Sequence, residues 1–440
     1  MKRYIWITVL LFIAAPLLTA QTTVEDVKTF TLKNGMKFIV LEDHSIPNIA
    51  LHIFYKVGSR NEYPGITGLS HFFEHMMFNG AQKYGPKMFD RVMEAAGGSN
   101  NAYTSEDVTC YTDWFPADTL ETMFDLEADR IHHLALDDKM VESERGVIIS
   151  ERITGLENSN FVLLAEQVCA VAFMAHPYRW SVIGYESDIK NWQKSDLQKY
   201  FDTYYAPNNA VAVIVGDINI NQVKTLAQKY FEPIPSREPP RPVHTVEPPQ
   251  MGEKRLIVEK DVTSPNIMAV YHIPNSKSED YYALTLLNAI LSDGKSSRLY
   301  RSLVDEQQLA VQVFSFFSTA IDPTLYYIYA ICAGDVPPDT LENAIHKEIA
   351  KIISDGVTEP ELQKAKNKQL VDFYRGMETL KGKADKLGTY EIFFGSYTEL
   401  FNAPKAFEKV TKEDIQSVAK KYLIKSNRTV GVLKKKEEQS

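Results

Sequence analysis

The segment GLSHFFEHMMFNG, residues 68–80, places two histidines and a glutamate within five positions of an otherwise apolar run. On a helix, His71 and His75 lie one turn apart and project from the same face, and Glu74 lies on the same side. Two imidazoles in this arrangement can bind one zinc ion, and a carboxylate beside them can take a proton from water. By itself, the segment is equally compatible with two core histidines and a salt-bridged glutamate, so the metal needs support from elsewhere in the chain.

A catalytic zinc ion usually has three protein ligands and one open position, so a third ligand must lie outside this segment. In ESERGVIISER, residues 142–152, Glu144 and Glu151 are seven positions apart and therefore share one face of a predicted helix. The adjacent His132 and His133 are expected at a helix C-terminus, where histidine is electrostatically favourable. Spacing alone does not choose among the acidic residues and histidines of this region, which are Glu106, Asp107, His132, His133, Glu142, Glu144 and Glu151.

The chain also contains a long internal repeat. SIPNIAL begins at Ser45 and TSPNIMA begins at Thr263, and both segments carry a Pro-Asn pair at their third and fourth positions. Nearer the ends of the two halves, DLQKYFDTYYAPNN begins at Asp196 and DIQSVAKKYLIKSN begins at Asp414. These two starts are separated by the same distance along the chain as Ser45 and Thr263. Two separated matches at one offset indicate a duplicated domain rather than a short solenoid unit.

A proline-rich segment separates the two halves. Residues 233–249, PIPSREPPRPVHTVEPP, contain seven prolines and little apolar content, which is typical of an extended linker. We therefore expect an N-terminal domain with the candidate metal site at 22–232, a linker at 233–254, and a C-terminal domain without the histidine motif at 255–436.

Each half mixes strand and helix patterns. Apolar and polar residues alternate as in strands at 36–43, 48–58, 210–217 and 256–260. Apolar residues recur at helical spacing at 87–98, 118–136 and 137–156. These patterns predict an α+β fold of two homologous domains, each an antiparallel-rich sheet packed with helices.

Composition excludes several classes of protein. The formal net charge of -9 argues against a nucleic-acid binder, which needs a basic surface. With 44% apolar and 24% charged residues, the chain of 440 residues can build two sizeable cores and shows no signature of disorder. Cys110, Cys169 and Cys332 are widely spaced, so we expect buried thiols rather than a disulfide framework.

The first residues have the layout of a secretory signal peptide. Lys2 and Arg3 precede an apolar run at 5–18, and a small-residue cleavage site follows at Ala20. The run is short for a membrane span, and an uncleaved anchor is the alternative. We expect residues 1–20 to be removed, the mature protein to be periplasmic or secreted, and no stable membrane insertion to remain.

Together, these segments resemble the M16 peptidases, the pitrilysin or insulinase family of zinc metallopeptidases. The resemblance begins with the inverted zinc motif His71-x-x-Glu74-His75, which is followed further along the chain by the final glutamate of ERGVIISE. It extends over roughly residues 28–435 and includes VGSRNEYPGITGLSHFFEHMMFNG, GGSNNAYTSEDVTCYTDWFP, HPYRWSVIGYESDI and YYAPNNAVAVIVGD. It implies paired α+β domains of the LuxS/MPP-like metallohydrolase type.

The resemblance implies a role for each residue of the motif. His71, His75 and Glu151 would be the ligands of one Zn2+ per chain, and Glu74 would be the general base. Glu144 would orient a histidine ligand, which is a recurrent need of zinc sites.

The resemblance also implies where a peptide substrate would bind. Asn101 and Ala102 would lie on an edge strand that pairs with the substrate backbone through main-chain hydrogen bonds. Without the family context, SNNAY could equally be read as an ordinary polar turn.

One segment departs from the family pattern. Self-sufficient relatives carry, in the second half, an arginine and a tyrosine seven positions apart, which would hold the substrate and stabilise the oxyanion. In SSRLYRSLVDEQQLAVQV, residues 296–313, those positions are Val304 and Val311. We therefore expect an M16B-type bacterial zinc-bearing subunit whose homologous partner chain supplies the pair in a heterodimer, with a homodimer as the alternative.

The sequence thus predicts a zinc-dependent endopeptidase that hydrolyses peptides or unfolded segments in an enclosed chamber. The alternative is a non-catalytic M16-like scaffold or peptide-binding subunit, which the two valines keep open. Against it, His71, Glu74, His75 and Glu151 are all present, whereas degenerate members usually lose this set.

Overall fold

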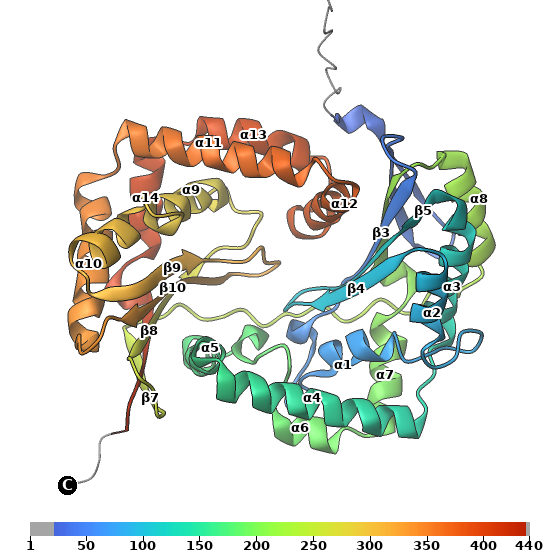
Figure 1. Ribbon diagram of the computed structural model, residues 1–440, viewed down its shortest axis with the longest axis horizontal. Helices are drawn as coiled ribbons and strands as arrows, with labels where there is room; N and C mark the ends of the chain where they lie inside the picture. The colour runs from blue at the N-terminus through green and yellow to red at the C-terminus, as the bar shows by residue number, and fades with distance from the viewer. Residues whose placement is uncertain (1–21, 437–440) are drawn as a thin grey trace, which may run out of the picture.

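Two mixed β-sheets, one from each half of the chain, form the frame of the protein (Figure 1). The structure is a computed structural model that describes residues 22–436. The expected signal peptide, residues 1–20, lies outside the described residues. Within the described part of the chain, no helix combines the length and the apolar character needed to cross a membrane.

The first sheet has six strands in the order β1-β2-β6-β3-β5-β4. They are β1 (Val27–Thr31), β2 (Lys37–Glu42), β3 (Asn48–Tyr55), β4 (Ser99–Thr104), β5 (Thr109–Pro116) and β6 (Ala210–Gly216). All neighbouring pairs are antiparallel except β2 and β6. The central strands β3 and β6 are buried along nearly their whole length, because both faces of this sheet are covered.

The second sheet has five strands in the order β7-β11-β8-β10-β9. They are β7 (Lys254–Glu259), β8 (Asn266–Ile273), β9 (Ala310–Phe316), β10 (Thr324–Cys332) and β11 (Arg428–Lys434). Here too a single pair of the described strands, β7 and β11, is parallel. The predicted α+β fold with two antiparallel-rich sheets is confirmed.

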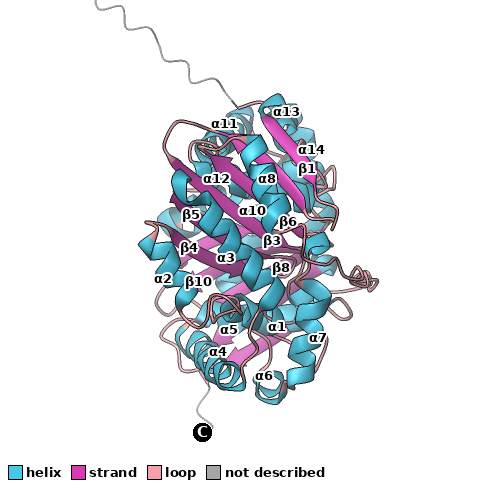
Figure 2. Cartoon of the chain, turned by 90° about the vertical axis from the view of Figure 1, so that its right-hand side faces the viewer, coloured by secondary structure: helices cyan, strands magenta, loops and turns pink. Residues whose placement is uncertain are grey.

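Helices surround both sheets (Figures 1 and 2). In the first half they are α1 (Leu69–Met76), α2 (Met88–Ala95), α3 (Leu120–His133), α4 (Asp138–Asn158), α5 (Asn160–Ala172), α6 (Glu186–Asn191), α7 (Lys194–Tyr204) and α8 (Ile220–Tyr230). In the second half they are α9 (Tyr281–Ser292), α10 (Pro338–Asp355), α11 (Glu359–Gly376), α12 (Leu380–Thr389), α13 (Glu399–Lys409) and α14 (Lys412–Tyr422). Helices α1, α4, α6 and α7 gather beside one another at one end of the first sheet.

The described part of the chain also contains short 3₁₀ and π-helical segments. The 3₁₀ helices are η1 (Val24–Asp26), η2 (Ser59–Asn61), η3 (Ala117–Thr119), η4 (Pro177–Arg179), η5 (Pro207–Asn209) and η8 (Lys425–Asn427). Two π-helical turns, η6 (Tyr300–Glu306) and η7 (Tyr390–Phe394), lie in the second half.

The internal repeat is visible in the fold. The strands β3 and β8, the strands β6 and β11, and the helices α7 and α14 correspond pairwise, with the same spacing along the chain as the sequence repeat. The side-chain amide of Asn209 donates to the carbonyl oxygen of Tyr204 at 2.8 Å, and that of Asn427 donates to Tyr422 at 2.8 Å. The two halves therefore share local hydrogen bonds as well as topology.

Each half contributes one helix that packs on the sheet of the other half. Helix α5 lies on β7, β8 and β11 of the second sheet, whereas α12 lies on β3 and β6 of the first. These contacts are close, since a Cβ on Gly431 of β11 would lie 2.4 Å from a Val168 methyl carbon and one on Gly388 of α12 would lie 2.0 Å from the Phe54 ring. Sequence periodicity does not reveal this exchange, because it shows that a helix buries one face without identifying what covers it.

The proline-rich connection carries no regular structure. Residues 235–253 contain no helix or strand, and β7 begins at Lys254. The domain limits expected from sequence, at 232/233 and 254/255, stay predictions, because the exchanged helices join the two halves across any single boundary.

Candidate metal centre

Helix α1 carries the two histidines, and its start is fixed by two features. Gly68 precedes it with a φ of 90°, in the left-handed region, and a Cβ there would lie 2.5 Å from the Ile183 carbonyl oxygen. The buried Glu62 carboxylate accepts hydrogen bonds from the backbone N–H groups of Gly68 and Ser70, both at 2.7 Å. A carboxylate at this end of a helix satisfies free N–H groups and is favoured by the helix dipole.

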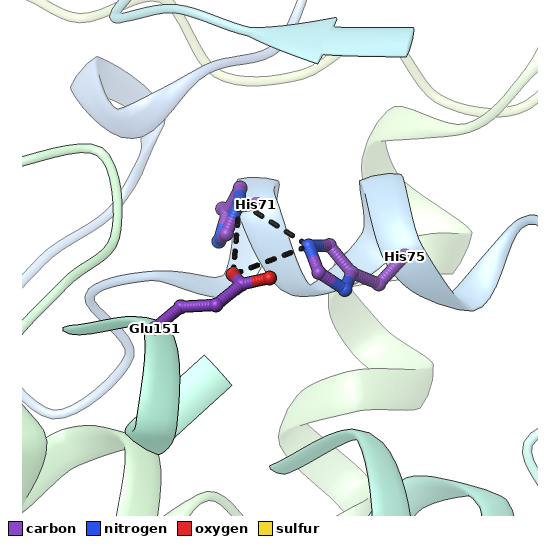
Figure 3. Close-up of side chains that lie close together, drawn as sticks. All are labelled: His71, His75 and Glu151. Atoms are coloured by element: carbon purple, nitrogen blue, oxygen red, sulfur yellow. Dashed lines mark hydrogen bonds and ion pairs between the residues drawn. The ribbon is translucent and has the colours of Figure 1, made fainter. Parts of the chain in front are cut away.

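The structure brings His71, His75 and Glu151 together, as Figure 3 shows. The Nε2 atoms of the two histidines are 3.3 Å apart. The Oε2 atom of Glu151, from α4, lies 3.6 Å from Nε2 of His75 and 4.0 Å from Nε2 of His71. Ligand atoms placed tetrahedrally at about 2.0–2.1 Å from zinc are about 3.3–3.4 Å apart. The two imidazole nitrogens have this spacing and the Glu151 oxygen lies slightly farther away, so the three residues could hold a zinc ion after a small shift of Glu151.

Exposure at this centre is uneven. The side chains of His71 and His75 are 18% and 19% exposed, whereas that of Glu151 is 44% exposed. The centre is therefore closed on the side of α1 and open on the side of Glu151, which suits a metal that keeps one position for a substrate or water.

Glu144 forms a hydrogen bond with His75. Its Oε1 atom lies 2.7 Å from Nδ1 of His75, and its Oε2 atom accepts a hydrogen bond from the Asn79 side chain, also at 2.7 Å. The hydrogen bond with His75 lowers the pKa of Glu144. An anionic Glu144 keeps the proton of His75 on Nδ1 and leaves the Nε2 lone pair for a metal.

The two histidines differ in their protonation. Burial, and after it the charge of His75, lowers the pKa of His71 to about 4. Burial also lowers the pKa of His75, but the hydrogen bond with Glu144 and the charges of Glu151, Glu144 and Glu74 outweigh it, so that this pKa is raised. The His71 imidazole is thus neutral over a wide pH range, whereas the His75 imidazole takes up a proton more readily.

Glu74 points toward the first sheet. Its Oε2 atom accepts a hydrogen bond from the Thr104 hydroxyl of β4 at 2.6 Å. Burial raises the pKa of Glu74, and the hydrogen bond from Thr104 opposes that rise. A partly buried carboxylate of raised pKa is a stronger base than an exposed one.

Asn101 and Ala102 lie on β4, at the edge of the first sheet (Figure 1). Among the described strands, β4 has the single neighbour β5, so its other edge can accept an extended peptide. Thr104 is two residues beyond Ala102 and therefore lies on the same face of the strand. Sequence reasoning missed Thr104, although this two-residue period could have placed it on the same face of the strand as Ala102.

The other residues that the sequence offered as a third ligand are not among the three side chains that converge, and they have other surroundings. Asp107 accepts a hydrogen bond from the Tyr178 hydroxyl at 2.7 Å, and its neighbour Glu106 shares the turn after β4. Glu142 pairs with Arg145 at 3.2 Å on the outer side of α4. His132 and His133 end α3, where the sequence placed them at a helix C-terminus.

The second half supplies no arginine or tyrosine at the two positions discussed above. Val304 lies in η6, where it packs against the second core, and Val311 lies exposed on β9. Arg298, in the same segment, forms a two-pronged ion pair with Glu361 at 2.7 and 2.9 Å. Its guanidinium group is therefore engaged inside the second half.

A fold of two related α+β units with a His-His-Glu centre and an adjacent carboxylate defines a metallohydrolase-like class of protein. Comparison with known families is more specific: residues 37–184 match the model described as Insulinase (Peptidase family M16), and residues 191–369 match that of the Peptidase M16 inactive domain. The chain belongs to peptidase family M16.

Relatives named zinc proteases match nearly the whole chain. It is 31% identical over 432 residues to the zinc protease PqqE of Helicobacter pylori, covering 97% of both chains. It is 24% identical over 394 residues to an uncharacterized zinc protease, YmxG, of Bacillus subtilis, covering 90% of this chain and 95% of that one.

Solved structures show the same architecture. A protease from Helicobacter pylori matches with a TM-score of 0.89 and 30% identity, over 93% of this chain and 99% of that chain. The periplasmic protease PqqL from Escherichia coli matches with a TM-score of 0.77 and 19% identity, which supports the fold. The match covers 94% of this chain but 48% of PqqL, so that PqqL is about twice as long.

Proposed function

We propose that the protein is a zinc-dependent endopeptidase, with His71, His75 and Glu151 as the ligands of one Zn2+. The observation that carries this proposal is the convergence of two imidazole nitrogens and one carboxylate oxygen within 4.8 Å of one another, beside Glu74. A bound zinc ion supplies Lewis-acid chemistry, which polarises a peptide carbonyl and acidifies a nearby water molecule. Two imidazoles and a carboxylate suit zinc, and the relatives named zinc proteases support that choice of metal.

Other residues of the chain transfer the proton, orient His75 and bind the substrate. Glu74 takes a proton from the attacking water and passes it to the leaving amine, which requires the carboxylate to be ionised first. Glu144 holds His75 in the tautomer that a metal needs. The free edge of β4, at Asn101 and Ala102, binds the substrate backbone, so peptides and unfolded segments are the substrates that fit.

We further propose that a homologous chain completes the active site. Val304 and Val311 occupy the positions where a substrate-holding arginine and tyrosine are expected, so a partner would supply that pair in a heterodimer that encloses the peptide. The double length of PqqL supports the idea that two such units work together. A homodimer is the second arrangement. The amino-terminal signal pattern, and the description of PqqL as periplasmic, favour a periplasmic or secreted location.

A non-catalytic scaffold or peptide-binding subunit is the competing function. The two valines favour it, as does the match of residues 191–369 to a domain described as inactive. The intact set of His71, Glu74, His75 and Glu151 favours catalysis, because a scaffold has no need for a base beside a metal.

Peptide cleavage separates these functions. The zinc-loaded protein is incubated with a mixture of short peptides, and products are read by mass spectrometry, with Glu74→Gln as a control that keeps the metal and loses the base. Cleavage by the wild type alone supports a self-sufficient peptidase and refutes the partner requirement. Zinc retained without cleavage leaves the divided site and the scaffold, and cleavage after co-purification with a homologous chain then supports the divided site. A protein that retains no zinc refutes the peptidase proposal.

A further inference from the structure

Glu151 belongs to a pair of consecutive helices, α4 and α5, that touches both halves of the protein. Helix α4 ends at Asn158 and α5 starts at Asn160, so one residue, Ser159, links them. The Ser159 hydroxyl accepts a hydrogen bond from the backbone N–H of Val162 and caps α5. The two helices pack against each other.

The beginning of α4 is held by the first half. Both terminal nitrogens of the Arg145 guanidinium group donate to backbone carbonyls, those of Ile189 and Trp192, the latter at 3.0 Å. One residue before it, Glu144 binds His75 of α1. This part of α4 is therefore tied to the half of the protein that carries the two histidines.

The end of α4 is held by the second half. The ammonium group of Lys260, directly after β7, donates to the carbonyl oxygens of Leu156 and Glu157 at 3.2 and 2.6 Å. Lys254 of β7 donates to two carbonyl oxygens at the end of α5, at 3.0 and 2.8 Å. Each lysine thus satisfies carbonyl groups at a helix C-terminus, where a cation is favourable.

Apolar packing also fixes α5 on the second sheet. The residues buried in this contact, each with no exposed surface, are Leu164, Val168 and Ala172 from α5 and Met268 and Leu433 from the sheet. Gly431 leaves the space for it, because a Cβ at that position would lie 2.4 Å from Val168 and 3.0 Å from Leu164. The second sheet therefore determines how deeply α5 can sit.

An ion pair connects this docked helix to the ligand itself. Arg152, the residue after Glu151, forms a two-pronged pair with Glu166 of α5 at 2.8 and 2.9 Å. The two side chains are 8% and 9% exposed, so each depends on the other for its charge balance. The pair fixes the rotation of α4 about its axis at the residue next to Glu151.

We propose that the second half of the protein positions the third metal ligand. It holds Glu151 against His71 and His75 through α5, Lys260 and the Arg152–Glu166 pair, which makes Arg152 and Glu166 positioning residues. This inference rests on the proposed zinc site. It gives the half without the histidine motif a role in metal binding, and it couples zinc affinity to the docking of α5.

Two matched glycine substitutions test the coupling. Gly431→Ala places a methyl group in the contact between β11 and α5, whereas Gly388→Ala places one in the even closer contact of α12 with Phe54. Zinc affinity is measured by competition with a fluorescent chelator. Gly431→Ala should weaken zinc binding roughly tenfold, the size of effect that loss of ligand support has elsewhere, and Gly388→Ala should leave it unchanged.

Two substitutions at Arg152 add no bulk to the core, so they test the coupling without the misfolding that an added methyl group could cause. Arg152→Gln should weaken zinc binding and alter the visible spectrum of the cobalt-substituted protein, and Arg152→Lys should restore part of the affinity. The control is Arg298→Gln, which breaks the similar two-pronged pair with Glu361 far from the histidines. It should change neither the affinity nor the spectrum.

Hydrogen exchange of the wild-type protein reports the same coupling without any substitution. Zinc should slow amide exchange in α5 and leave α12 unaffected, because linkage between two events acts in both directions. Unchanged zinc affinity in Gly431→Ala and Arg152→Gln, with no zinc effect on α5, overturns this inference alone. A wild-type protein that does not bind zinc overturns the proposed function together with it.

Discussion

Replacement of Glu144 by glutamine should weaken zinc binding, although it leaves all three proposed ligands in place. The carboxylate now accepts two hydrogen bonds at 2.7 Å, one from His75 and one from Asn79. An amide can accept only one of them, because its NH2 group must face the other donor. If the NH2 group faces His75, the proton of that ring is driven onto Nε2, where it blocks the metal.

The size of this effect follows from the orientation that is lost. Removal of such a partner of a histidine ligand lowers metal affinity by about 10- to 100-fold, or about 1.4–2.7 kcal/mol. The deficit should also depend on pH. Glu144 helps to raise the pKa of His75, so in the variant protons compete less strongly with zinc for the His75 ring. The difference in zinc affinity between the variant and the wild type should therefore shrink as the pH falls through the titration of His75.

Competition with a zinc chelator at several pH values measures both effects. Glu142→Gln is the matched control, because Glu142 is on the same helix, two residues earlier, with a side chain that is 68% exposed and directed at Arg145. Equal zinc affinity of Glu144→Gln and the wild type at pH 8 would refute the assigned role of Glu144.

Three further predictions follow from residues outside the ligand set. Thr104→Val removes the hydrogen bond that lowers the pKa of Glu74, so the acid limb of the kcat/KM profile should move to higher pH by up to about one unit; an unmoved limb would separate Thr104 from catalysis. Burial lowers the pKa of His52 to about 4, below the unfolded value of about 6.5, so its neutral form stabilises the fold above pH 6.5 and this contribution is lost as pH falls toward 4. His52→Leu should therefore lose about 2 kcal/mol less stability than the wild type between pH 7.5 and 4.5 in urea titrations, and parallel losses would contradict this. Gly146 lies inside α4 with open space where its Cβ would be, so Gly146→Ala should raise the free energy of unfolding by about 0.5–1 kcal/mol, and an unchanged urea midpoint would count against it.

The parts of the fold that depend on local pattern could be predicted from the sequence. The spacing of the internal repeat reappears as matching strands and helices, because each copy of the repeat forms the same contacts within its own half. The alternating segments became strands, and the predicted helix C-terminus at His133 is where α3 ends. Residues four apart on a helix must share a face, so the pairing of His71 with His75 needed no knowledge of the rest of the fold.

The parts that depend on docking between distant segments could not be predicted in this way. Spacing left seven candidates for the third ligand, and the crossing of α4 over α1 brings Glu151 to the histidines. The exchange of α5 and α12 is invisible in their periodicity. The ion pair of Arg152 with Glu166 likewise depends on how two helices pack, and Glu166 lies beyond the last helix predicted from the sequence, at 137–156.

Zinc K-edge X-ray absorption on the purified protein tests the metal centre most directly. The expected result is one zinc per chain, with nitrogen and oxygen ligands at about 2.0–2.1 Å, scattering from two imidazoles and no sulfur. In His75→Gln the zinc and this signature should be lost together. Sulfur ligation, or the same spectrum in His75→Gln as in the wild type, would contradict the assignment of His71, His75 and Glu151 as the metal site.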